Sequence, residues 1–279
     1  MPNYGYHLAR AEGRLVRRIY RELLSLIVRR PIQPRRSVPL KVFSYSGEST
    51  LPEQIASIRS FLKHAGRPDR FTVVSDGTYS ARSAALLQRI DPSVVVDELP
   101  EAPANLAPKL HSYVTTHPTG KQLRLIMSLP REGPTLYVDS DVLFFPQAHD
   151  LAALANSRDV SAFYLADCQL SGDERLFRTE TEKAQPVNTG VLLFFQPFDW
   201  SLSIARFVEL QGEPNFFTNQ TMVHLAAHEN GAAPLDASKY LLRLDDQTVY
   251  PDRYASNALA LRHYVNPVRH KFWMTLWRQ

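Results

Sequence analysis

Two aspartates one residue apart stand in the middle of an apolar segment that runs from Thr135 to Phe145. Side chains at positions i and i+2 leave a strand on the same side, so the carboxylates of Asp139 and Asp141 can face one cation. Carboxylate oxygens are the ligands that Mg²⁺ and Mn²⁺ prefer. The segment predicts a buried strand whose end, or a sharp bend in it, carries a site for Mn²⁺ or Mg²⁺. The alternative is that the two acids only cap a strand-to-turn junction, where Asp is common.

A second group of candidate residues lies near the C-terminus, where residues 263–273 hold His263, Arg269 and Lys271 among aromatic side chains. The imidazole can supply a further metal ligand, and the cations can bind phosphate. Because residues 263–273 contain no acid, we expect the three cations to repel one another until an anion binds, and the segment to close only then. The alternative is that the aromatic residues pin the C-terminus while the cations stay solvated.

Alternation of apolar strands with helices begins at residue 38. We expect strands at residues 38–45, 71–77 and 93–99, and helices at residues 51–65 and 79–90. This order predicts an α/β fold with a mostly parallel central sheet that is flanked by helices. Ligands of such sheets bind at the carboxyl ends of the strands. Ser44, Tyr45, Ser46 and Asp76 therefore fall where a nucleotide would bind, with Tyr45 bordering the base.

The second half of the chain carries further polar residues at strand ends. After two expected helices, around Lys109 and at 119–129, the strand at 160–167 ends in Asp167. A surface loop should follow to residue 186. The triplet Asn188-Thr-Gly190 then opens an apolar strand, where the glycine permits close backbone approach and Asn188 can donate and accept hydrogen bonds. A plain turn before a strand is the alternative. A further helix is expected at 217–228.

The N-terminal 37 residues differ from the rest in charge. They contain nine Arg, no Lys and two Glu, a net charge of 9 − 2 = +7, while the remaining chain carries 4 − 7 = −3. We expect two parts: a basic amphipathic helix with a Pro-rich connector at 1–37, and one domain at 38–279. The helix, at residues 7–30, could make peripheral contact with an anionic membrane, bind a partner's groove, or pack its Leu15, Ile19, Leu23, Leu26 and Ile27 stripe on the protein's own body.

Composition excludes several classes. A mildly acidic body argues against nucleic-acid binding, which needs a basic face on the folded domain. Apolar runs long enough to span a bilayer are missing. The single cysteine, Cys168, excludes an internal disulfide and fits a reducing compartment. We expect a cytoplasmic protein; peripheral contact of the basic helix at 7–30 with the inner face of the membrane is one of the three alternatives for that helix. Oligomeric state is not indicated.

Taken together, these features resemble nucleotide-sugar glycosyltransferases of the Rossmann-like GT-A fold, most closely glycosyltransferase family 8, which includes glycogenin and bacterial lipopolysaccharide galactosyltransferases. The likeness covers about residues 38 to 273. Leu136-Tyr-Val-Asp-Ser-Asp-Val is similar to the family's metal-binding Asp-x-Asp signature. The resemblance makes His263 the third metal ligand, Lys121 a donor contact on the preceding helix, and Asp167 and Asn188 contacts to the donor sugar.

Two departures from the family pattern concern the reacting centre and the diphosphate. The family has Asp-Gln at the start of a late helix, whereas this chain has Asn219-Gln220, which keeps the amide of Gln220 and lacks the carboxylate. The C-terminal pattern leaves either Arg269 or Lys271 as the diphosphate contact, with spacing in favour of Arg269.

The resemblance implies a metal-dependent hexosyltransferase that moves a sugar from a nucleoside diphosphate sugar, expected to be a UDP-sugar, to an acceptor hydroxyl with retention of configuration. Asp167, Asn188 and Gln220 would hold the sugar. One alternative is a catalytically degenerate protein that binds nucleotide sugar. Another is a haloacid-dehalogenase-type phosphatase, although its motif ordinarily follows the first strand of its domain. The sequence does not indicate the donor sugar or the acceptor.

Overall fold

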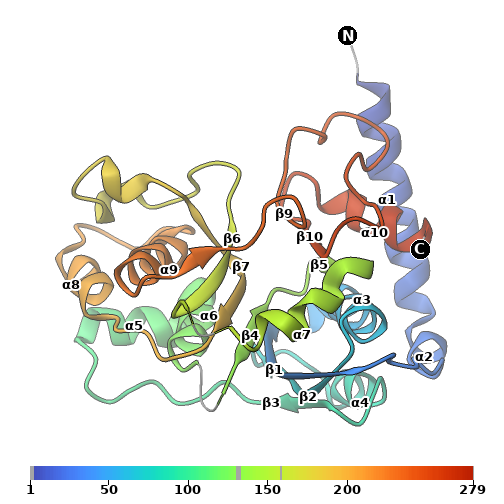
Figure 1. Ribbon diagram of the computed structural model, residues 1–279, viewed down its shortest axis with the longest axis horizontal. Helices are drawn as coiled ribbons and strands as arrows, with labels where there is room; N and C mark the ends of the chain where they lie inside the picture. Colours follow the sequence, from blue (N-terminus) through green and yellow to red (C-terminus); the bar gives the residue numbers. More distant parts are fainter. Residues whose placement is uncertain (1–2, 130–132, 158, 279) are drawn as a thin grey trace.

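The computed structural model describes residues 3–129, 133–157 and 159–278. A seven-stranded sheet forms its centre, in the order β3-β2-β1-β4-β7-β6-β8 (Figure 1). Four neighbouring pairs are parallel, and β7 runs antiparallel to both β4 and β6. The strands are β1 (Ser37–Ser46), β2 (Arg67–Ser75), β3 (Val94–Asp97), β4 (Thr135–Val138), β6 (Ala162–Ala166), β7 (Val187–Phe194) and β8 (Ala233–Pro234). The predicted mostly parallel α/β sheet is confirmed.

Helices cover both faces of this sheet because alternate strand residues point to opposite sides. Val42 belongs to a core that includes residues of α3 (Leu51–His64), α4 (Ala81–Gln88) and α7 (Leu151–Leu154). Its neighbour Phe43 belongs to the core on the other face. That core includes residues of α5 (Pro108–Thr116), α6 (Pro118–Met127), α8 (Ser201–Glu209) and α9 (Thr218–Glu229). The strands before residue 100 and most helices lie where the sequence predicts, whereas α8 was missed.

A second sheet of three short strands lies beside the first. It pairs β5 (Val142–Phe144) with β10 (Leu261–His263), and β10 with β9 (Tyr240–Leu241). The apolar segment at 135–145 therefore bends between two sheets: β4 ends at Val138 and β5 begins at Val142. The predicted sharp bend is confirmed, and it lies at Asp139 and Asp141.

The expected helix at 7–30 forms two helices, α1 (Tyr4–Glu22) and α2 (Leu24–Ile27). α1 lies against the C-terminal helix α10 (Arg269–Arg278), which the sequence did not predict as a helix (Figure 1). A Cβ atom at Gly13 would lie 2.5 Å from the backbone oxygen of His270, so glycine permits this close crossing.

The face of α1 that packs on the body differs from the apolar stripe whose packing was one of the three alternatives. Its buried residues are the small ones, Ala9, Gly13 and Val16. Leu15 is 59% exposed and Leu26, in α2, is 57% exposed. Intramolecular packing therefore leaves much of the apolar stripe uncovered. Within the described ranges, no helix combines the length and the apolar character that crossing a bilayer requires.

Candidate active site

The two aspartates occupy the turn between β4 and β5, which fixes their backbone from several sides. The amide of Asp139 donates to the carbonyl of Gly190 at 2.9 Å, and the amide of Tyr264 donates to the carbonyl of Asp141 at 2.9 Å. The carboxylates thus converge because neighbouring strands hold a turn. The expected cause, the two-residue repeat of an extended strand, does not apply, since the strand ends at Val138.

His263, at the end of β10, faces both carboxylates. Its Nε2 lies 3.0 Å from Oδ1 of Asp141 and 3.7 Å from Oδ2 of Asp139. Its Nδ1 donates to Oδ1 of Asn188 at 2.9 Å, which fixes the orientation of the ring. The candidate ligand atoms of the three residues all lie within 4.8 Å of one another. The structure therefore brings together the three residues predicted as metal ligands.

The charges of this cluster depend strongly on one another. Burial raises the pKa of Asp139 to about 6; His263 opposes this shift and Asp141 adds to it. Burial alone would raise the pKa of Asp141, but His263 and Arg269 outweigh it and hold that pKa below its usual range. Burial disfavours protonation of His263, yet the neighbouring acids raise its pKa overall. The cluster thus pairs a partly buried acid, Asp139, with a buried one, Asp141, and favours positive charge beside them.

Arg269 supplies such a charge, and Lys271 does not. Arg269 donates from Nη2 to Asp141, and its side chain is 47% exposed at the rim of the cluster. Lys271 is fully buried and donates to the carbonyls of Val249 and Pro251 at 2.9 and 2.7 Å. The ammonium of Lys271 therefore has structural partners, and Arg269 is the cation that a ligand at the cluster can reach.

The expected repulsion within the C-terminal segment is wrong, because acids from elsewhere in the chain neutralise it. Asp141 contacts both His263 and Arg269. Asp246 lies 3.5 Å from Lys271 and also binds the buried Arg262 at 2.8 Å. These ion pairs remove the expected repulsion, whereas closure of the segment upon ligand binding stays a prediction. Counting charges within residues 263–273 could not reveal these partners.

Asp139 has two further polar neighbours that the sequence did not single out, Tyr137 and Gln122. Tyr137 donates to Oδ1 of Asp139 at 2.8 Å, and Gln122 donates to the same oxygen at 3.0 Å. Asn219, at the start of α9, donates to Oε1 of Gln122 at 2.9 Å. The unusual Asn219 thus reaches the metal cluster through Gln122. Lys121, the predicted donor contact, is the preceding residue of α6 and is only partly buried.

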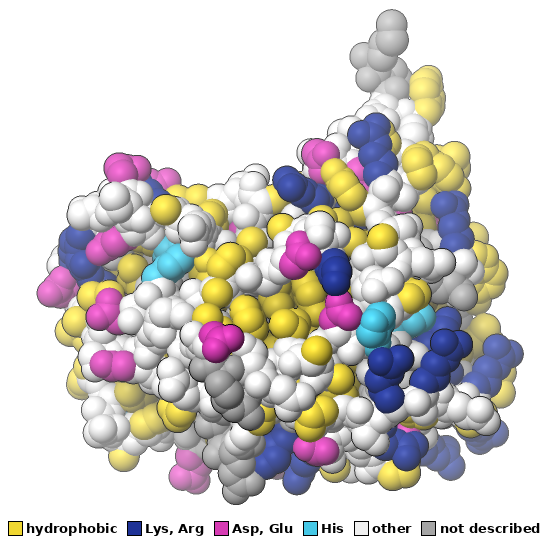
Figure 2. Space-filling view, in the orientation of Figure 1, with side chains coloured by type: hydrophobic (Ala, Val, Ile, Leu, Met, Phe, Trp, Pro, Cys, Tyr) yellow, Lys and Arg dark blue, Asp and Glu magenta, His cyan; other side chains and the backbone are white. Residues whose placement is uncertain are grey.

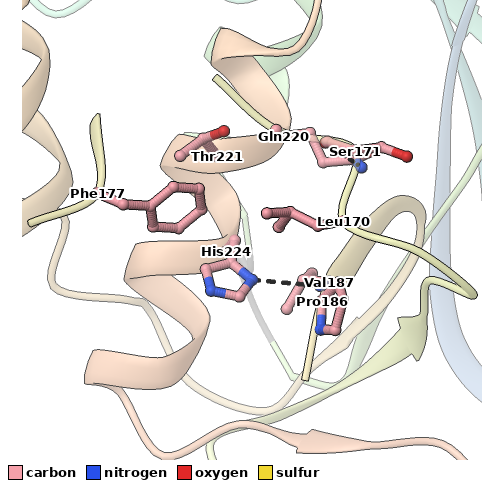
Figure 3. A pocket seen from close by; sticks show the side chains of 9 residues that line it. Leu170, Ser171, Phe177, Pro186, Val187, Gln220, Thr221 and His224 are labelled. Atoms are coloured by element: carbon pink, nitrogen blue, oxygen red, sulfur yellow. Dashed lines mark hydrogen bonds between the residues drawn. The ribbon is translucent and has the colours of Figure 1, made fainter. Parts of the chain in front are cut away.

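A second polar group adjoins His263 through Asn188. The amide nitrogen of Gln220 donates to Oδ2 of Asp167 at 3.1 Å and to the carbonyl of Ser171 at 2.8 Å. Asn188 donates to the same oxygen of Asp167 at 3.3 Å. Figure 3 shows Gln220 beside Ser171 at one edge of a small pocket, and His224, which also lines the pocket, facing Val187. The three residues predicted to hold a sugar therefore form one hydrogen-bonded group.

The residues predicted to contact a nucleotide lie at the carboxyl ends of β1 and β2, as expected. They differ in whether their polar groups are free to contact a ligand. The hydroxyls of Ser44 and Ser46 are buried and donate to Oε1 of Gln54 at 2.7 and 2.8 Å. Tyr45 is half-buried; burial first, and then Asp76, raises its pKa to about 12. A Cβ atom at Gly47 would lie 2.1 Å from an oxygen of Asp76. These contacts indicate that the serines shape the loop, whereas Tyr45 and Asp76 remain partly exposed.

Comparison with solved structures gives the fold. The galactosyltransferase LgtC, solved in complex with donor and acceptor sugar analogues, matches with a TM-score of 0.54 and 15% identity over 85% of this chain and 95% of its own. Mouse xyloside xylosyltransferase 1 matches with a TM-score of 0.54 and 15% identity, covering 84% of this chain and 99% of its own. The glycosyltransferase GlyE of Streptococcus pneumoniae matches with a TM-score of 0.53 and 13% identity over 86% and 60% of the two chains.

This chain has the GT-A fold. No family model matches the sequence, and no curated protein matches it. At this level of identity, similarity to these structures establishes the fold and not the reaction. Within this fold, the acidic turn lies at the end of β4.

Proposed function

We propose that this GT-A protein is a metal-dependent glycosyltransferase, which moves a sugar from a nucleoside diphosphate sugar, expected to be a UDP-sugar, to an acceptor hydroxyl. The observation that carries the proposal is the convergence of Asp139, Asp141 and His263 at the turn between the two sheets. The fold alone does not determine the function, because one fold can support many reactions. Placing two acids and an imidazole together in one turn is costly unless a bound cation compensates their charge.

The three residues fit Mn²⁺ or Mg²⁺. In an octahedral shell with metal–ligand distances of about 2.1 Å, neighbouring ligand atoms are about 3 Å apart. The separations from Nε2 of His263 to the two carboxylates, 3.0 and 3.7 Å, are close to this value. The hydrogen bond from Nδ1 of His263 to Asn188 leaves Nε2 directed at the acids. When bound, the ion would act as a Lewis acid that offsets the negative charge of the departing diphosphate.

The side chains around the cluster have distinct roles in this proposal. Arg269 faces the diphosphate from the exposed rim and adds a permanent positive charge where negative charge develops. Asp167, Asn188 and Gln220 offer carboxylate and amide groups to sugar hydroxyls, and their mutual hydrogen bonds fix their orientation. Gln220 is the polar group kept at the reacting centre, which favours the retaining outcome.

A degenerate nucleotide-sugar-binding protein is the second candidate, because Asn219 stands where a carboxylate is expected. It predicts donor binding without turnover. The phosphatase alternative is weaker, since both aspartates are engaged with His263 and the acidic turn follows the fourth strand of a GT-A sheet.

A thermal-shift screen of UDP-sugars with and without Mn²⁺ tests the proposal. A donor at a hundred times its dissociation constant should stabilise the protein by about 2.7 kcal/mol, and only when Mn²⁺ is present. The selected donor is then assayed for hydrolysis and for transfer, with product configuration read by NMR. Asp139→Asn and Asp141→Asn should lose the Mn²⁺-dependent shift and the turnover, while Asp69→Asn, an exposed control, should keep both.

The outcomes separate the candidates. Binding without any turnover would favour the degenerate protein. Hydrolysis of a phosphomonoester in place of a UDP-sugar would favour the phosphatase. Activity that persists in EDTA, or in both Asn variants, would contradict the metal assignment.

A further inference from the structure

A large groove lies beside α1, between α1, α2, the connector that follows them, and α3. Its volume is about 1050 Å³. Apolar side chains of α1 and α2 form one wall, among them Ile19, Leu23 and Leu26, and Trp277 of α10 closes one end. Three of these four are at least 40% exposed: Leu23 at 41%, Leu26 at 57% and Trp277 at 65%.

The remaining wall of the groove is basic. Six residues that can carry positive charge line it: Arg30, Arg35, Arg36, Arg59, Lys63 and His64. Among the residues that the structure describes, no acid lines the groove and none of the six pairs with a carboxylate. Figure 2 shows Lys and Arg side chains gathered on the side of the molecule where α2 lies in Figure 1, next to hydrophobic side chains along the edge of α1.

Two of the six basic residues, Arg59 and His64, are partly buried, and neither has an acidic partner among the described residues. The guanidinium of Arg59, which is half-buried, donates to the carbonyl of Arg30 at 3.0 Å. A buried Nε2 atom of His64 has no hydrogen-bond partner. Burial lowers the pKa of His64 to about 4, and the charges of Lys63 and Arg35 add to the effect. An anion in the groove would supply hydrogen-bond acceptors and negative charge together.

We infer that this surface docks the protein on an anionic membrane, with the phosphate headgroup of an acidic phospholipid in the basic groove and the apolar face of α1 in the lipid interface. The exposed face of α1 has the amphipathic pattern that binding at a lipid interface requires. Tyr4, Leu8, Leu15 and Ile19 recur at intervals of four and seven residues and are all exposed. Arg14 and Arg18 flank them, and Trp277 adds an aromatic side chain of the kind that interfaces favour.

Charge complementarity selects a membrane over a second copy of this chain. The first 37 residues carry a net charge of 9 − 2 = +7, so two such segments face to face would repel. An anionic bilayer offers negative charge and an apolar interior in the same surface, which matches both walls of the groove. This inference concerns a surface outside the candidate active site and does not depend on the reaction proposed there.

Vesicle flotation of the full chain tests the inference. Vesicles of phosphatidylcholine with one-third phosphatidylglycerol should bind the protein, and vesicles of phosphatidylcholine alone should not. The triple variant Arg35→Gln, Arg36→Gln, Lys63→Gln should weaken partitioning roughly 100-fold, which corresponds to about 1 kcal/mol for each cation. Leu8→Glu with Leu15→Glu should reduce binding even in low salt. On binding, the fluorescence of exposed Trp277 should shift to the blue, and Trp277→Phe should remove the shift.

Matched controls keep the test specific. The triple variant Arg82→Gln, Arg89→Gln, Arg243→Gln removes the same charge from exposed positions that do not line the groove, and Val208→Glu places an acid on the exposed face of α8. Both should bind as the parent does. Equal binding to neutral vesicles, or equal binding by the groove and control variants, overturns the inference. So does full competition by millimolar glycerol phosphate, or a lipid-free dimer that Leu15→Glu dissociates.

Discussion

Gly190 lies directly against the imidazole of His263: a Cβ atom at position 190 would approach Cε1 of that ring to 2.1 Å. The same glycine holds Asp139 through its carbonyl and Asn188 through its amide. Glycine at this position therefore makes room for the third candidate metal ligand. The triplet Asn188-Thr-Gly190 is not a plain turn before a strand, because all three residues belong to β7.

We expect Gly190→Ala to displace His263 and to weaken Mn²⁺ binding by tenfold or more, in the range seen when groups that orient metal ligands are lost. Isothermal titration with Mn²⁺ measures this directly. Gly5→Ala is the control, since a Cβ atom there meets nothing closer than 3.5 Å. If Gly190→Ala binds Mn²⁺ as tightly as the parent, His263 is not a ligand.

Asn219 and Gln122 form a matched pair of amides. Asn219 donates to Oε1 of Gln122, which leaves the Gln122 nitrogen free to donate to Asp139 and Tyr137. An aspartate at 219 would place an acceptor against Oε1. Asn219→Asp should therefore destabilise the protein by about 1–3 kcal/mol, as for other buried groups left without partners.

The same contact predicts a rescue. Gln122→Lys in the Asn219→Asp background should form an ion pair, so the double variant should be more stable than the sum of the single changes by about 0.5–3 kcal/mol. Denaturant unfolding of the four proteins gives this coupling energy. Strict additivity would mean that the two side chains act independently, contrary to the 2.9 Å contact.

Substitutions of Lys271 and Arg269 should have different effects, the first on stability and the second on catalysis. Lys271→Met leaves Asp246 and two carbonyls short of a partner in the core and should cost about 3–5 kcal/mol, which lowers Tm by roughly 10 °C. Arg269→Ala acts at the half-exposed rim and should leave Tm within a few degrees while it lowers kcat more than it raises the donor KM. Calorimetry and steady-state kinetics separate the two. Equal losses of Tm would contradict the assignment.

Much of the fold could be predicted because its strands are continuous apolar runs. Val42 and Phe43 bury opposite sides of β1 in two cores, as a parallel strand covered on both faces requires. The metal candidates were predictable too, since Asp139 and Asp141 interrupt such a run.

The unpredicted features depend on contacts between distant residues. Consecutive helix residues differ by about 100° in direction, so spacing alone did not distinguish Lys121 from Gln122, which contacts Asp139. The packing of α1 against α10 was not predicted for a related reason. A hydrophobic pattern is defined by large residues such as Leu15. The close approach of α1 to α10 depends instead on Gly13, which has no side chain and therefore does not contribute to such a pattern.

His224 should make the stability of the protein depend on pH. Nε2 of His224 donates to the carbonyl of Glu182 at 2.6 Å, and its Nδ1 accepts from the amide of Val187 at 3.3 Å, so the structure requires the neutral ring. Burial lowers the pKa of His224 to about 4, whereas an unfolded chain has the usual value of about 6.5. Between these values the unfolded state binds more protons, and the free energy of unfolding must fall as pH falls.

We expect His224 to contribute a loss of up to about 3 kcal/mol between pH 7 and pH 4, complete once the folded protein also binds the proton. Urea unfolding at half-unit intervals should show a shallower decline for His224→Gln than for the parent. Val223→Ala, which opens a buried site on the same helix without removing a titratable group, should lower stability at every pH and keep the parent's slope. Parallel curves for His224→Gln and the parent would mean that His224 protonates as readily in the folded protein as in the unfolded chain.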